Sequence, residues 1–187
     1  MPRTLHFIKH GKPHLDPEIP AHDWRLADDA LVALPALAAA LSPRPELVVC
    51  SMEPKAQATA QGLAAVLGVP LRPMLGLHEQ LRYTAPWRPD PADFQADLRR
   101  FFDQPEQVVS GEESAWDARI RFGNAVSAVM QVNPQDTVAV VAHGTVISLL
   151  VAHLTGQAPY ELWRSLPLLG HLTLTWEPGP PNLRKRL

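Results

Sequence analysis

The chain alternates between short apolar runs and longer segments with helical spacing. Apolar runs at residues 4–9, 47–50 and 138–142 have the length and composition of strands buried in a sheet. Residues 69–75 are a candidate for a further strand. Residues 172–176 alternate apolar side chains with threonine, as a half-buried edge strand does. The pattern therefore predicts a sheet built from short strands.

The longer segments place apolar residues three and four positions apart, which predicts helices. They cover residues 27–41, 55–67, 91–102, 114–130 and 146–154. Pro35 lies inside the first segment and predicts either a kink or a late start of that helix. Because strands and helices alternate along the chain, we expect an α/β fold, a three-layer α/β/α sandwich with a mostly parallel central sheet.

The length and composition of the chain fit one globular domain. At about 150 residues per domain, the 187 residues predict a single domain spanning 1–187. Residues 12–26 and 76–110 are expected to form loops and a small cap on that domain. With 46% hydrophobic residues, the chain does not resemble a disordered protein. A formal net charge of -2 disfavours a nucleic-acid partner, because such proteins are usually basic.

The apolar runs are too short for a membrane protein. None approaches the ~18 residues of a transmembrane helix, and Lys9 interrupts the N-terminal run, so a signal peptide is not expected. The single cysteine, Cys50, excludes a disulfide framework and a cysteine-based zinc site. These features predict a cytoplasmic protein without a membrane partner.

Proline is unusually frequent in the chain. The chain has 20 prolines among 187 residues, about twice the usual ~5%. Pro13, Pro17 and Pro20 lie in the first long loop, and Pro86 and Pro89 lie in the second. Because proline fixes its own φ angle, we expect these two loops to be stiff.

Two of the predicted strands end in the same dipeptide, His10-Gly11 and His143-Gly144. In an open α/β sheet, ligands bind beyond the carboxyl ends of the strands, so both histidines are expected at that edge. Gly11 and Gly144 would let the backbone approach a ligand closely. One histidine at a strand end is usually structural. Two histidines in the same context are as consistent with a functional site as with a structural role.

The same edge of the sheet is expected to carry positive charge. Gly144 and Thr145 begin a helix, whose free N–H groups and dipole favour an anion. Lys9, Lys12 and Lys55 also follow or end predicted strands, although each lysine taken alone is typical of a solvated surface. Imidazoles and ammonium groups around an anion site are what phosphoryl transfer requires, because its catalysis is mostly positioning and charge stabilisation.

Five segments, in this order, resemble the signatures of the histidine phosphatase superfamily, also called phosphoglycerate-mutase-like. They are Lys9-His10-Gly11, the stretch Ser51-Met52-Glu53-Pro54-Lys55-Ala56-Gln57-Ala58-Thr59-Ala60, Leu77-His78-Glu79, Gly111-Glu112-Glu113-Ser114, and Val140-Val141-Ala142-His143-Gly144-Thr145-Val146-Ile147. The resemblance spans residues 4–175 and implies the phosphoglycerate-mutase-like fold. Each segment alone is a weak signal, and their common order makes the signal strong.

The resemblance implies a metal-independent phosphomonoesterase that uses no cofactor. His10 corresponds to the nucleophile that forms a phosphohistidine, and His143 to the second histidine, which holds the transferring phosphoryl group. Glu79 corresponds to the proton donor of the leaving oxygen, and burial or phosphate charge is expected to raise its pKa. The implied partner is a small phosphomonoester substrate. The sequence specifies neither the identity of that substrate nor the oligomeric state.

The chain departs from the family at two phosphate-binding positions. Lys9 and Lys55 stand where the family has arginine, and Gly11, Gly144 and Thr145 complete the implied phosphate site. Lysine keeps the charge but loses the planar bidentate fork of arginine. Three functions therefore stay open: phosphomonoester hydrolysis, which we favour, a phosphoglycerate-mutase-type transfer, and phospholigand binding with weak or no catalysis.

Several further polar residues lie in the same regions. The candidates for contacting a second anionic group of the substrate are Lys12, Arg25 and Arg82. His6, His10 and His14 are spaced like metal ligands on a helix, but Pro13 prevents a stable helix there. We therefore expect no metal site.

Overall fold

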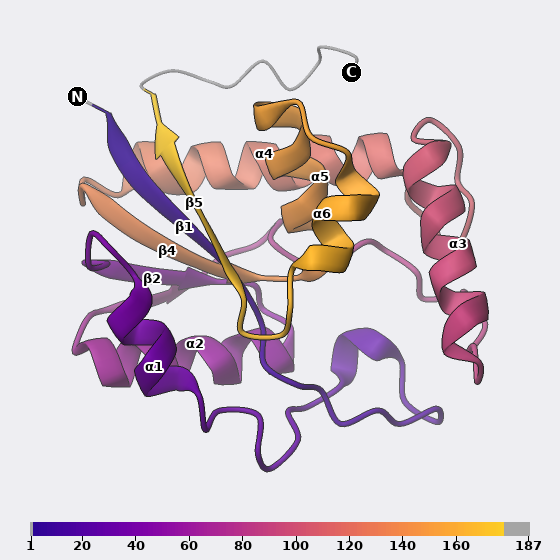
Figure 1. Cartoon of the computed structure of the whole chain (residues 1–187), viewed down its shortest axis with the longest axis horizontal. Coiled ribbons are helices and arrows are strands. Elements are labelled where there is room, and N and C mark those ends of the chain that lie inside the picture. The colour runs from indigo at the N-terminus through magenta and orange to yellow at the C-terminus, as the bar shows by residue number, and fades with distance from the viewer. Residues whose placement is uncertain (1, 178–187) are drawn as a thin grey trace.

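The structure, a computed structural model, describes residues 2–177 (Figure 1). Within this range five strands form one sheet, namely β1 (Arg3–Lys9), β2 (Leu47–Cys50), β3 (Leu71–Pro73), β4 (Thr137–Ala142) and β5 (His171–Trp176). Their order across the sheet is β3-β2-β4-β1-β5. The edge strand β5 runs antiparallel to β1, and the other neighbours are parallel. The mostly parallel sheet predicted from the sequence is confirmed.

Helices cover both faces of this sheet (Figure 1). One face carries α1 (Leu34–Ala40) and α2 (Pro54–Leu67). The other carries α4 (Ala115–Val132) and α5 (Gly144–Thr155), with α3 (Pro91–Asp103) and α6 (Pro159–Ser165) packed beyond them. The three-layer α/β/α sandwich is therefore confirmed. Among residues 2–177, no helix combines the length and the apolar character needed to span a membrane.

Two details of the helices differ from the sequence prediction. The first helix starts late rather than kinking, because Pro35 stands in its first turn, where a missing N–H is tolerated. Helix α6 and the short 3₁₀ helix η1 (Ala21–Asp23) were not predicted. Each is shorter than two and a half helical turns, so hydrophobic periodicity could not reveal it.

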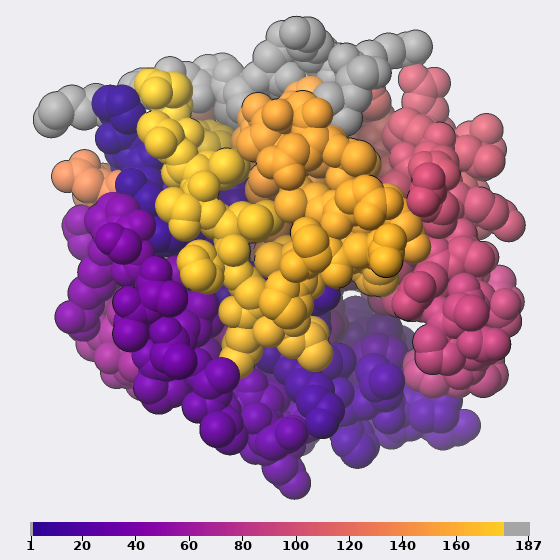
Figure 2. Space-filling view, viewed as in Figure 1, coloured from indigo at the N-terminus to yellow at the C-terminus, as the bar shows by residue number. Residues whose placement is uncertain are grey.

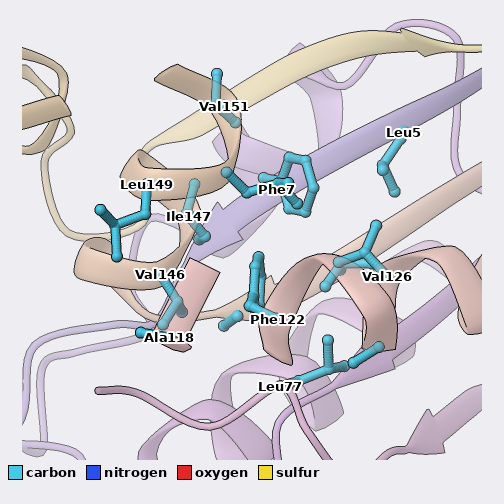
Figure 3. Packing of buried hydrophobic residues seen from close by; sticks show 14 of the residues in the cluster. Leu5, Phe7, Leu77, Ala118, Phe122, Val126, Val146, Ile147, Leu149 and Val151 are labelled. Carbon is cyan, nitrogen blue, oxygen red and sulfur yellow. The ribbon is translucent and has the colours of Figure 1, made fainter. Parts of the chain in front are cut away.

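The central strand β4 divides the core into two clusters. Val138 and Val140 face α4 and α5, whereas Ala139 and Val141 face α1 and α2. On the first side, the Phe7 ring of β1 lies 5.9 Å from the ring of Phe122 (Figure 3). All six residues of β4 are buried, as expected for a strand covered on both faces.

Strand register brings three chain segments together at the carboxyl edge of the sheet. Lys9 at the end of β1 pairs with Ala142 at the end of β4. Cys50 at the end of β2 pairs with Val141. The residues that follow these strands, including His10 and Ser51, therefore meet at one edge, which is where ligands bind in open α/β sheets.

Candidate active site

A cavity of about 220 Å³ opens at this edge. Figure 2 shows the molecule hollowed between the loop after β1, α3 and the region of α6. The segments 12–26 and 76–110, predicted to form loops and a cap, both contribute to its walls. The predicted site residues that line it are Lys9, His10, Lys55, Glu79, Arg82, Gly144 and Thr145.

His10 has a defined tautomer. Its Nδ1 lies 2.7 Å from the carbonyl oxygen of Gly11, which can only accept a hydrogen bond. Nδ1 therefore carries the proton, and Nε2 keeps its lone pair. Burial lowers the pKa of His10 from 6.5 to about 4, with Gly11 opposing the shift and Lys55 reinforcing it. At neutral pH His10 is thus an uncharged imidazole with a free nucleophilic nitrogen.

His143 lies beside His10 and is fully buried. The centroids of the two rings are 5.2 Å apart, and the ring planes meet at 63°. The Nε2 atom of His143 lies 2.8 Å from the hydroxyl of Ser51 and 3.5 Å from a carboxylate oxygen of Glu53. Because a carboxylate only accepts, this neighbour favours a proton on Nε2. Burial, reinforced by His10, holds the pKa of His143 well below its ordinary value. His143 is therefore a neutral imidazole whose Nε2 can donate a hydrogen bond.

The carboxylate of Glu79 lies on the N-terminus of α5. Its oxygens accept hydrogen bonds from the N–H groups of Thr145 and Val146, both at 3.2 Å. The N–H of Gln80 donates to it at 2.9 Å. A negative charge at a helix N-terminus is stabilised by the free N–H groups and the helix dipole. The Thr145 N–H, predicted to bind phosphate, is thus occupied by Glu79.

The pKa of Glu79 differs from the sequence expectation. Burial alone raises it, but Arg82 and the N–H of Gln80 are among the groups that lower it by more. The pKa therefore lies below the ordinary value of 4.5 instead of above it. The prediction considered burial and phosphate charge and did not include the cations and N–H groups that the fold gathers around this carboxylate.

The two lysines at the phosphate-site positions have different surroundings. Lys9 donates to the carbonyl of Leu166 at 3.1 Å, and burial lowers its pKa against the opposing effect of Glu79. Lys55 is 5% exposed and forms an ion pair with Glu53. It also donates to the carbonyl of Ala21 at 2.7 Å. The loop that carries Ala21 is therefore tied to the floor of the cavity.

The two glycines act on protein neighbours. A Cβ at Gly11 would lie 2.9 Å from the carbonyl oxygen of Ala30. The N–H of Gly11 donates to Thr59 at 2.9 Å, so its backbone is fixed against the helix α2. A Cβ at Gly144 would lie 3.0 Å from the side chain of Lys9. The glycine at the start of α5 thus leaves the space that this lysine occupies.

Four of the predicted site residues do not line the cavity, namely His143 and Gly11, which are described above, and Lys12 and Arg25. Lys12 is exposed and pairs with Asp29 at 3.4 Å. Its carbonyl accepts the N–H of Ala27, so this stretch of chain pairs with the end of the same loop. Arg25 lines a separate open depression on the surface. Of the three candidates for a second anionic contact, only Arg82 lines the cavity.

Sequence analysis missed two residues at the centre of the site, Glu53 and Ser51. Glu53 pairs with Lys55 and accepts the N–H of Glu79 at 2.8 Å, so it links two of the predicted site residues. Its place in the segment after β2, two residues before Lys55, was the available signal. Its role depends on side-chain direction, which spacing alone did not give.

A partly buried ion pair holds the segment that carries Glu79. Arg121 of α4 pairs with Glu113 at 2.8 Å and donates to the carbonyls of His78 and Glu79 at 2.9 and 3.1 Å. Glu113 also accepts the N–H of Leu81. The resemblance had marked the segment around Glu113 without assigning it a function. The contacts identify the pair as a positioning element for Glu79.

The histidine spacing that resembled a metal site has a structural explanation. His6 is buried in β1, with its two ring nitrogens 2.8 Å from the Thr173 hydroxyl and the Pro43 carbonyl. His14 lies in an exposed part of the loop after β1. Within residues 2–177, no group of three or more histidine, cysteine or acidic side chains is arranged to hold a metal ion.

Acidification is expected to destabilise the fold partly through His10. Because its folded pKa is depressed to about 4, the unfolded chain binds a proton below pH 6.5 that the folded chain does not. Its contribution to the free energy of unfolding should fall by about 2–3 kcal/mol between pH 7 and pH 4.5. Urea denaturation of the parent and His10→Asn at both pH values measures this difference. An equally steep loss in His10→Asn would contradict it, and His14→Asn is the exposed control.

The sequence model of the histidine phosphatase superfamily (branch 1) matches residues 5–186. A mycobacterial glucosyl-3-phosphoglycerate phosphatase is 23% identical, with 94% of this chain and 91% of that chain covered and a TM-score of 0.72. A phosphoserine phosphatase mutant from Entamoeba histolytica, in complex with phosphoserine, is 17% identical, with coverage of 91% and 89% and a TM-score of 0.71. A putative alpha-ribazole-5'-P phosphatase from Escherichia coli is 18% identical, with coverage of 91% and 89% and a TM-score of 0.66. A search of curated proteins found no match.

Proposed function

Because this chain belongs to branch 1 of the histidine phosphatase superfamily, we propose that it hydrolyses a small phosphomonoester through a phosphohistidine on His10. One observation carries the proposal. The Nδ1–H of His10 is held by the Gly11 carbonyl, which leaves the Nε2 lone pair at a cavity lined by Lys9, Lys55 and Glu79. Structural relatives include phosphatases named for small phosphorylated substrates, which supports the same reaction class.

In the first step, Nε2 of His10 attacks the phosphorus in line with the bond to the leaving oxygen. The N–P bond forms as that P–O bond breaks, and protonated Glu79 gives its proton to the leaving oxygen. A bound phosphate brings negative charge beside Glu79, which raises its pKa toward the protonated form. For His143 to hold a phosphoryl oxygen, its Nε2–H must exchange its neighbours in the free enzyme, the Ser51 hydroxyl and the Glu53 carboxylate, for that oxygen.

In the second step, the carboxylate of Glu79 removes a proton from water, and the resulting nucleophile attacks the phosphorus. The N–P bond breaks, inorganic phosphate leaves, and His10 returns to its neutral form while Glu79 is again protonated. In the first step the leaving oxygen departs from the side of the phosphorus opposite His10, and in the second step water attacks from that same side. Glu79, as the acid–base residue on that side, therefore serves both steps.

Positive charge for the transferring group comes from the lysines, and the neutral His143 adds a hydrogen bond, so the proposed reaction requires no metal. Lys9 and Lys55 contribute their charges to the floor of the cavity, and Arg82 lies on its wall. Glu53 balances Lys55 in the free enzyme. We therefore expect a phosphate dianion to compete with the carboxylate of Glu53 for Lys55, and this competition favours doubly charged esters.

A panel of phosphomonoesters tests the proposal. Release of inorganic phosphate from at least one ester by the parent and not by His10→Ala is the expected result. Transfer between two positions of 3-phosphoglycerate without phosphate release would indicate a mutase. Binding of esters without turnover would indicate a non-catalytic phospholigand protein. Either of these last two results would overturn the proposed hydrolysis.

Substitution of Lys9 tests whether lysine at this position is compatible with catalysis. Lys9→Arg is expected to keep or raise kcat/KM, because arginine restores a bidentate contact with phosphate. Lys9→Gln is expected to lower kcat/KM by about 100-fold, the scale seen when a group that stabilises transition-state charge is removed. Steady-state kinetics on one ester measures both, with exposed Lys12→Gln as the matched control. Full activity in Lys9→Gln would show that this lysine does not bind the phosphoryl group.

A further inference from the structure

The walls of the cavity differ in chemistry from its floor. Four aromatic side chains from three separate parts of the chain line them, namely Trp24, Tyr83, Phe94 and Trp163. Trp24 lies in the loop after β1, Tyr83 and Phe94 lie in the loop before α3 and in α3 itself, and Trp163 lies in α6. Phosphoryl transfer at His10 requires none of these rings, so they need a separate explanation.

One wall begins directly beside the phosphate site. The ammonium of Lys9 lies 5.8 Å from the ring of Trp163, whose ring centroid lies 6.4 Å from that of Phe94. The guanidinium of Arg82 lies 5.0 Å from the Phe94 ring and continues the wall outward. A leaving group only a few bonds from the phosphorus would therefore meet a ring of this wall.

A second group of aromatic side chains also belongs to the opening, and it remains open to solvent. Tyr83 is 55% exposed, and its ring centroid lies 4.4 Å from that of His22. Trp24 contacts Trp87, which is 43% exposed, with ring centroids 5.9 Å apart. Large aromatic surfaces that are exposed around a cavity are typical of ligand contacts, because burying them against a ligand is favourable.

Hydrogen bonds hold the indole of Trp24 and the backbone of Tyr83 before any ligand arrives. The indole N–H of Trp24 donates to the carbonyls of Asp16 and Ile19, both at 2.9 Å. The backbone N–H of Tyr83 donates to the carboxylate of Glu112 at 2.8 Å. Aromatic walls that are already ordered bind a ring with little loss of conformational freedom.

We propose that the phosphomonoester hydrolysed at His10 carries an aromatic or heteroaromatic ring in its leaving group, which packs against the cavity-lining rings of Trp163, Phe94 and Tyr83. The inference rests on the proposed function. Aromatic rings attract one another beyond simple area burial when their centroids are about 4.5–7 Å apart. The cavity of about 220 Å³ lies below the ~300 Å³ of typical ligand pockets, so the ring system is small.

Esters that differ in the ring but not in leaving-group acidity test this proposal. The probes are 2-phenylethyl, 2-cyclohexylethyl and n-butyl phosphate, which all release a primary alkoxide, so differences in kcat/KM report contacts with the ring. The kcat/KM for the phenylethyl ester is expected to exceed that for the butyl ester by about tenfold, and to be clearly higher than that for the cyclohexylethyl ester. Titration with the matching phosphonates gives a second readout that needs no turnover.

Substitutions in the cavity walls connect this preference to the rings. Phe94→Leu and Tyr83→Leu are expected to reduce the phenylethyl-to-butyl ratio of kcat/KM several-fold. Phe94→Tyr keeps a ring and should preserve the ratio. Val132→Ala, an exposed position at the end of α4, is the control.

The outcomes separate this inference from the proposed function. Hydrolysis of all three esters at similar rates, or equal preference for the phenyl and cyclohexyl esters, would overturn the aromatic preference and leave the phosphatase intact. Failure to hydrolyse any ester would overturn the proposed function and, with it, this inference. A phenylethyl preference that survives both leucine substitutions would place the ring elsewhere and overturn the assignment.

Discussion

His10→Ala is expected to abolish phosphate release, with kcat lowered by at least ~10⁴-fold, the scale seen when a catalytic nucleophile is removed. The expectation follows from the tautomer of His10, whose Nδ1–H is held by Gly11 and whose Nε2 is free. It also follows from its low pKa of about 4, which leaves the imidazole uncharged at neutral pH. Alanine offers no group that can accept the phosphoryl.

Two controls keep this prediction specific. Far-ultraviolet circular dichroism and a denaturation midpoint show whether the variant folds. His14→Ala removes a histidine from the same segment at an exposed position outside the cavity, and it should keep full activity. Phosphate release by well-folded His10→Ala at the parent rate would exclude His10 as the nucleophile.

Glu79→Gln is expected to have the second largest effect, and that effect should depend on the leaving group. An alkyl ester needs a proton on its leaving oxygen, so loss of the acid should lower kcat by about 10²–10⁴-fold. A nitrophenyl ester has a stable leaving group and should lose much less in the first step. Single-turnover kinetics with both esters measures the difference. Equal losses for the two esters would show that Glu79 does not act as the acid.

The pH dependence of the parent follows from the same two residues. His10 must be neutral, which holds above its pKa of about 4. Glu79 must be protonated, and in the free enzyme its pKa is lowered below 4.5. For alkyl esters kcat/KM should therefore decline as pH rises through the neutral range, and kcat should decline from a higher pH because bound phosphate raises the Glu79 pKa. Constant kcat/KM for an alkyl ester from pH 5 to pH 8 would contradict this assignment.

The strands and the sheet edge could be predicted from the sequence because they depend on local pattern. Short buried runs that alternate with amphipathic segments specify a parallel sheet, and a parallel sheet gathers its strand ends. His10 and His143 each follow such a strand, so their proximity at one sheet edge was foreseeable, and their ring centroids are 5.2 Å apart. Glu79 lies in a long loop, and its place rested on the family resemblance alone.

Other parts of the site depend on side-chain direction and on tertiary contacts that no local pattern encodes. Lys12 is only three residues from Lys9, yet its segment pairs with residues at the end of the same loop and turns the lysine toward Asp29. Glu53 was overlooked because its partners, Lys55 and the Glu79 N–H, come from two different segments. Each of these positions is set after the chain segments have packed.

The most direct test of the account is to trap the enzyme during turnover with its best ester and locate the phosphate. A rapid quench in alkali, followed by peptide mass spectrometry, should find a phosphate on His10 that survives alkali and is lost in acid. The same peptide from His10→Ala should carry none. A phosphate on another residue, or turnover without any phosphorylated peptide in a quench faster than kcat, would contradict the central claim that His10 carries the phosphoryl group.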